Sequence, residues 1–161
     1  MFKKIGIATG ALAMVAAPAA FADTYTPAST STFSGPVTVQ KDGLQYNCTL
    51  TVNVDATAGS SASATASLSG GFPCGLIAVN GTGTVFYNGT NLRISGLELD
   101  PPISSGVCNG PIKANWGGNS ATPRTITLSV PFSNSSATTG APCKMAGTLS
   151  QTAGAPVSVT P

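Results

Sequence analysis

The amino-acid sequence predicts an all-β fold, namely a single antiparallel β-sandwich or barrel-like domain with two disulfides, preceded by a signal peptide. Three observations support this prediction. Apolar and polar residues alternate with period two in several short segments, turn-forming pairs such as Asn-Gly lie between those segments, and four cysteines follow an export leader. No window outside the leader has a helical period, so we expect strands throughout the domain.

Residues 1–22 are typical of a secretory signal peptide. Lys3 and Lys4 form its basic start, an apolar stretch follows, and Ala20 and Ala22 supply the small residues of a cleavage site. The apolar stretch is interrupted by glycine and proline, and no later segment approaches the roughly 18 apolar residues that a membrane span needs. We therefore expect cleavage after Ala22 and a secreted, extracellular domain over residues 23–161, with the periplasm as the alternative location.

The expected domain begins with a flexible arm and continues as a series of strands. Residues 23–35 are rich in Ser and Thr and predict the arm. The strongest strand signal is LQYNCTLTVNV at 44–54, in which every second residue from Leu44 is apolar or Cys and Gln, Asn and Thr dominate the positions between. The same alternation predicts further strands at 62–68, 112–116, 126–132 and 143–149.

Turn signals separate the expected strands. Asn-Gly pairs on both sides of 84–87 predict that this strand pairs with each of its neighbours along the chain. In 92–99, LRISGLEL, the apolar phase shifts across Ser95-Gly96, as a β-bulge would require. The stretch 133–142 predicts a long loop. The turn signals are KDG (41–43), NG (80–81), NG (88–89) and DPP (100–102).

Charge is scarce in this chain. Without residues 1–22, five basic residues balance five acidic ones, so the expected net charge of the mature domain is zero. A neutral domain has no basic stripe for phosphates, which argues against nucleic acid and against electrostatic binding to membranes. It also lacks the repulsion that keeps proteins apart, which favours self-association or adsorption.

The four cysteines, Cys48, Cys74, Cys108 and Cys143, are most simply two disulfides in an exported protein. A metal site is disfavoured because their spacing is too wide for a zinc knuckle and the chain has no histidine. A nucleophilic Cys74 would need a nearby base or cation, which its sequence neighbourhood lacks. Three connectivities are open, and we favour Cys48–Cys74 with Cys108–Cys143 because these pairs close the shorter loops.

Catalytic candidates are few. Without histidine no Ser-His-Asp or Cys-His site can form, and Lys144 fits a solvated strand lysine better than a buried base. Glu98 and Asp100 would form a calcium or glycosidase-like site only if other acids converged on them. Trp116 fits a core position better than an exposed stacking platform. We expect no enzyme activity, no catalytic residues, no metal and no cofactor, and the residues identify no ligand-binding site.

Six segments of the chain resemble the alkane oxidation protein activators, a family of small exported bacterial proteins. The segments are TPAST to VTV (26–39), LQYNCTLTVNV, LSGGFPCGLIAVNG, ISGLEL, VCNGPIKANW and CKMAGTLS, and together they span nearly all of the expected mature domain. The resemblance implies a secreted factor that promotes growth on long-chain alkanes by helping to disperse or contact the hydrocarbon. It supplies no catalytic residues.

Two functions follow as expectations. The first is a non-enzymatic accessory protein at the hydrocarbon surface, with hydrocarbon or cell-surface material as its partner. The second is a self-assembling structural subunit, a pilin or biofilm-matrix protein, that joins its copies through edge strands. The arm at 23–35 and the VSVT segment at 157–160 are the strands that such a subunit could donate.

Overall fold

The computed structural model describes residues 23–102, 106–128, 136–137, 141 and 143–161. The expected signal peptide, 1–22, lies outside the described residues, as does most of the expected loop at 133–142. Within the described ranges the regular elements are β-strands and one short 3-10 helix, η1 (Cys74–Leu76). The all-β prediction is confirmed, and of the two expected architectures the structure has the barrel.

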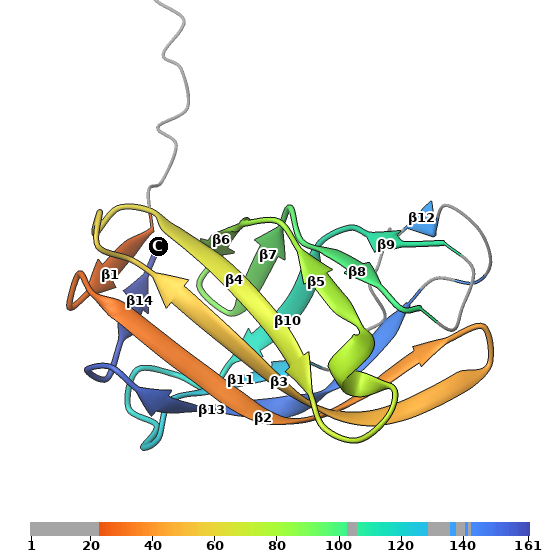
Figure 1. Ribbon diagram of the computed structural model, residues 1–161. Helices are drawn as coiled ribbons and strands as arrows, with labels where there is room; N and C mark the ends of the chain where they lie inside the picture. Colours follow the sequence, from red (N-terminus) through yellow and green to blue (C-terminus); the bar gives the residue numbers. More distant parts are fainter. Residues whose placement is uncertain (1–22, 103–105, 129–135, 138–140, 142) are drawn as a thin grey trace, which may run out of the picture.

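Eight antiparallel strands close into this barrel (Figure 1). They follow the order β10-β11-β13-β2-β3-β4-β6-β7, and β7 pairs back onto β10. Because the barrel is closed, each of the eight strands has a hydrogen-bonded neighbour on both sides. Their bounds are β2 (Thr30–Lys41), β3 (Leu44–Asp55), β4 (Ala62–Ser69), β6 (Gly83–Tyr87), β7 (Asn91–Ser95), β10 (Ile112–Trp116), β11 (Thr125–Leu128) and β13 (Lys144–Ala153).

Two smaller sheets accompany the barrel. One has the order β12-β9-β8-β5, and the other pairs β1 with β14, the first and last strands of the described chain. The strands of both sheets are only two or three residues long. Their bounds are β1 (Thr24–Thr26), β5 (Ala78–Asn80), β8 (Glu98–Asp100), β9 (Cys108–Asn109), β12 (Ser136–Ala137) and β14 (Ser158–Thr160).

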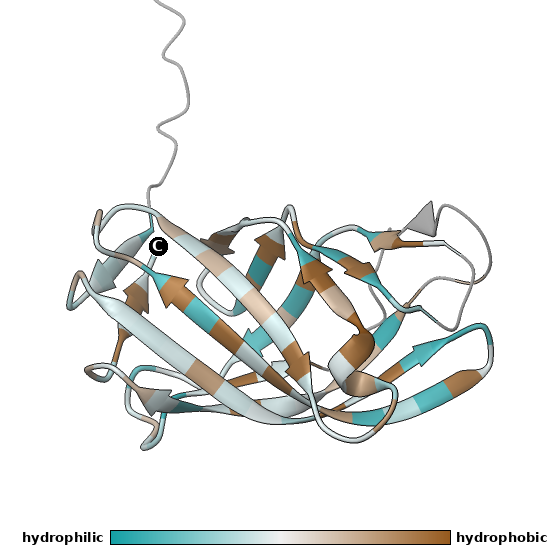
Figure 2. Ribbon diagram, in the orientation of Figure 1, coloured by the Kyte–Doolittle hydropathy of each residue, from teal (hydrophilic) through white to brown (hydrophobic). Residues whose placement is uncertain are grey.

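Strands β2 and β3, each of 12 residues, form one long hairpin of the barrel wall. Its turn places Asp42 at φ 52° and Gly43 at φ 80°, the paired positive values of the tight turn that matches strand twist. Every residue of β2 then has a partner on β3. Hydrophobic and hydrophilic residues alternate along both strands (Figure 2), and Leu50 and Val52 are buried in the core as the period-two pattern predicted. Leu44, beside the turn, is exposed instead.

Gly35 and Pro36 lie in the middle of β2, where the backbones of β2 and its neighbour β13 approach each other closely. A Cβ at Gly35 would meet the carbonyl oxygen of Thr148, and one at Gly147 would lie 2.8 Å from the Cα of Val37. The register between β2 and β13 has a gap at Gly35 and Pro36, which is where proline lacks the N–H that a ladder needs. Glycine on both strands therefore permits a close approach that any side chain would prevent.

The prediction of a flexible arm at 23–35 is wrong. Residues 24–26 form β1, and β2 already begins at Thr30. Tyr25 is buried, its backbone N–H donates to Gly59, and its hydroxyl donates to the carbonyl of Val85 at 3.2 Å. Burial, together with the Asp23 carboxylate, raises the pKa of this hydroxyl. Ser and Thr are common in turns, but here they lie in paired strands that bury Tyr25 and Phe33, and this packing outweighs their turn preference.

Two predictions about the middle of the chain need correction. The Asn-Gly at 88–89 does join β6 to β7, but the Asn-Gly at 80–81 leads out of β5, which pairs with β8 rather than with β6. The second neighbour of β6 is β4. At Ser95-Gly96 the structure has no bulge within one strand, because β7 ends there and β8 continues in the four-stranded sheet.

Candidate functional site

The cysteines form the two disulfides that the sequence favoured. Cys48 of β3 bonds to Cys74 of η1 with 5.5 Å between their Cα atoms, and Cys108 of β9 bonds to Cys143 with 6.0 Å. All four are buried. The first bridge pins the loop after β4 against the barrel wall, and the second ties the four-stranded sheet to the start of β13.

The first bridge holds a loop whose large apolar side chains face solvent. This loop, residues 70–76, is called the Phe72 loop below. Phe72 is 81 % exposed and Leu76 is 61 % exposed, whereas Cys74 between them is buried. The amide of Cys74 donates to Gly71 at 2.8 Å and that of Leu76 to Pro73 at 2.8 Å. The loop contains no charged residue, and hydrophobic residues gather around η1 (Figure 2).

A second exposed feature is a groove of about 670 Å³ on β6, β7 and β10. Its centre is a row of three residues on adjacent strands, in which Phe86 is opposite Arg93 and Arg93 is opposite Lys113. All three are exposed on the outer face, while Leu92 and Ala114 next to them in sequence are buried. The row is called the Phe86 row below.

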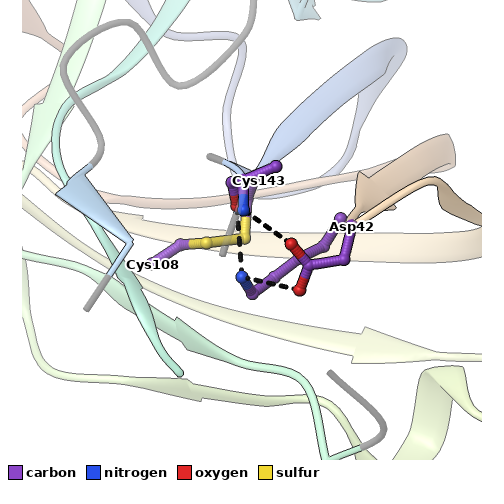
Figure 3. A network of polar contacts seen from close by, with 5 residues as sticks. Asp42, Cys108 and Cys143 are labelled. Carbon is purple, nitrogen blue, oxygen red and sulfur yellow. Dashed lines mark hydrogen bonds and ion pairs between the residues drawn. A yellow bond between two sulfur atoms is a disulfide. The ribbon is translucent and has the colours of Figure 1, made fainter. Parts of the chain in front are cut away.

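A buried lysine, Lys41, lies at the turn between β2 and β3. Lys41 is 2 % exposed, and its Nζ lies 3.2 Å from the Asp42 carboxylate and 3.1 Å from the Ala141 carbonyl oxygen. The amide of Ala141 donates to Asp42 at 2.6 Å, so the carboxylate and the Cys108–Cys143 bridge lie close together (Figure 3). That amide first, and Lys41 second, lower the pKa of Asp42. The network closes the hairpin end onto the segment before β13.

Comparison with known proteins assigns the family. The model of the alkane oxidation protein activator PraA/PraB-like family matches residues 1–159. The chain belongs to this family. No curated protein and no solved structure matches it.

The catalytic candidates weighed from the sequence do not converge in this PraA/PraB-like protein. Glu98 and Asp100 lie on β8, and no group of three or more metal-ligating side chains occurs among the described residues. Lys144 is exposed at the start of β13. Trp116 packs partly buried against Phe33, with ring centroids 6.1 Å apart in an edge-on arrangement, as a core residue would.

Both strands that a self-assembling subunit could donate are paired within the PraA/PraB-like chain itself. Thr24–Thr26 pairs with Ser158–Thr160, and Arg124 fixes the approach to β14 by donating to the carbonyl of Val157 at 2.8 Å. The described helix, η1, is too short to cross a membrane.

Sequence reasoning missed the exposed loop, the Phe86 row and the buried lysine. The lysine had a signal, because Lys41 is in phase with the inward-facing Val37 and Val39. The other two had none, because nothing in the residues next to Phe72 marks it as exposed, and the row depends on the pairing of β7 with β10.

Proposed function

We propose that this PraA/PraB-like protein is a secreted, non-enzymatic accessory protein that promotes the bacterial use of alkanes by acting at the hydrocarbon surface. The observation that supports the proposal most is the Phe72 loop. It presents two large apolar side chains on a segment that a disulfide and three backbone hydrogen bonds hold in place. Because the loop is already ordered, little conformational entropy remains to be lost when it enters an apolar phase.

The loop supplies enough energy for reversible adsorption. Burying a large apolar side chain completely is worth about 1.5–3 kcal/mol, so the exposed parts of Phe72 and Leu76 together provide about 2–4 kcal/mol. That free energy corresponds to a preference for the oil of roughly 30- to 1000-fold. The absence of charge on the loop matters equally, since a charged group would have to be desolvated on entry.

Partitioning between buffer and emulsified hexadecane tests the proposal. We expect the oxidised 23–161 protein to collect on the droplets, and the F72S/L76S variant to lose at least about 10-fold of that preference. L44S is the matched control, because Leu44 is also an exposed large apolar residue but lies on β3, outside both the Phe72 loop and the groove, and this variant should adsorb like wild type. Wild-type protein that stays in the buffer, or a double variant that adsorbs like wild type, would overturn the proposal.

Light scattering of the same samples without oil separates the alternative. Particles that grow in buffer, combined with no preference for droplets, would favour a self-assembling structural subunit. Adsorption by a dispersed monomer supports the surface-active accessory protein.

A further inference from the structure

The Phe86 row combines two cations in an arrangement that is unfavourable without a ligand. Arg93 and Lys113 are directly opposite each other on β7 and β10. Like charges in opposite positions of neighbouring strands repel each other. The domain 23–161 has only five basic residues, so the placement of two of them side by side concentrates positive charge in one groove of a domain whose net charge is zero.

Among the described residues, no acidic side chain forms an ion pair with Arg93 or Lys113. The ion pair found among the described residues joins Lys41 to Asp42, at the turn between β2 and β3 and outside the groove. Neither Arg93 nor Lys113 makes an ion pair or a side-chain hydrogen bond with the part of the chain that the structure describes. Their donors therefore point into solvent within a groove of about 670 Å³, a size typical of small-molecule sites.

The third member of the row sets the chemistry of the ligand. Phe86 is opposite Arg93 on the side away from Lys113, and this residue is 53 % exposed. A guanidinium group binds a carboxylate through two parallel hydrogen bonds, and a neighbouring ammonium adds a point charge. The aromatic ring next to them offers apolar contact to whatever is attached to that carboxylate.

We propose that the groove over β6, β7 and β10 binds a single-chain amphiphile with a carboxylate head, of the fatty-acid class. The carboxylate lies between Arg93 and Lys113, and the alkyl chain runs over Phe86. Carboxylic acids are the products of complete terminal oxidation of alkanes, so such a site would bind an oxidised product rather than the hydrocarbon itself. The proposal rests on the groove and not on the Phe72 loop.

Calorimetric titration with dodecanoate below its micelle concentration tests the site. We expect one dodecanoate per chain, and an affinity lower by about 10-fold or more in R93Q and in K113Q, the cost of removing one charge-assisted contact. F86S should weaken dodecanoate but leave the weak binding of acetate unchanged. K144Q is the matched control, because Lys144 is an exposed strand lysine outside the groove, and it should bind like wild type.

Two further ligands test whether binding needs the charged head group, and whether the groove binds a free amphiphile or a lipid surface. Dodecanol has the same tail without the charge and should bind at least about 10-fold more weakly than dodecanoate. Absence of dodecanoate binding, or an R93Q/K113Q variant that binds it like wild type, would overturn the proposal. So would binding to anionic phospholipid vesicles without binding of dodecanoate monomers. F72S/L76S should retain dodecanoate binding, so failure of the hexadecane experiment and failure of this one are distinguishable.

Discussion

Removal of the Cys48–Cys74 bridge is the perturbation whose size follows most directly from the structure. The bridge closes a loop with a sequence separation of 26 residues, and the chain-entropy model assigns such a loop about 3.5 kcal/mol of stability. Both cysteines are buried, so the C48A/C74A variant also leaves a small cavity that adds to the loss. We expect the free energy of unfolding to fall by about 3.5 kcal/mol or more.

Urea denaturation followed by circular dichroism measures this loss. With a slope of about 1.5 kcal/mol/M for a domain of this size, the midpoint should fall by about 2 M. C108A/C143A is the companion variant, because its separation of 35 residues gives a similar loss of about 3.8 kcal/mol at a different place. The C48A/C74A variant alone should free the Phe72 loop for rapid amide exchange. A midpoint shift below about 1 M, or equal protection of the loop in both variants, would refute the reasoning.

Two further predictions concern β13 and the hairpin end. Gly147→Ala should lower the free energy of unfolding by at least about 2 kcal/mol, since its Cβ would collide with the Pro36 carbonyl, whereas Gly43→Ala, with positive φ but open space, should cost about 1 kcal/mol. Equal urea midpoints for these two variants would contradict this. The pKa of Asp42 is lowered, so its contribution is present above the usual carboxyl pKa of about 4 and is lost as pH falls through the lowered value. Wild type should therefore exceed Asp42→Asn in urea midpoint at pH 6, and the difference should disappear near about pH 2, whereas a constant difference would contradict the assignment.

Local patterns predicted the strands well because each strand buries one face. In β3, β4 and β10 the inward residues are those that the period of two selects, and the KDG turn has the φ values that a tight hairpin needs. Pairing of the cysteines followed from loop length. These features depend on neighbours a few residues apart, or on the closure of one short loop.

The order of the strands could not be read in the same way. Asn80-Gly81 has the chemistry of a hairpin turn, yet the chain there passes from the four-stranded sheet into the barrel. It returns at Gly96, and the two crossings are so close that a Cβ at Gly81 would lie 2.6 Å from the Gly96 carbonyl oxygen. Turn chemistry fixes the local backbone and says nothing about which sheet receives the next strand.

The candidate sites depended on this long-range order. Arg93 and Lys113 are twenty residues apart in the sequence and become neighbours only through the register of β7 with β10. Phe72 resembles any core phenylalanine in the sequence, yet it is exposed in a loop whose Cys74 is bonded to Cys48, 26 residues earlier. A single sequence contains no signal for either arrangement.

The pairing of β1 with β14 places the first and last described strands side by side, so an attachment through either of them is at the same place on the molecule. These two strands lie at one end of the barrel, beside the start of β4, whereas the Phe72 loop follows the end of β4 (Figure 1). The seven residue steps along β4 separate the two by about 23 Å. A tether, a fusion domain or a solid support joined through either terminal strand would therefore leave the apolar loop about 23 Å from the point of attachment.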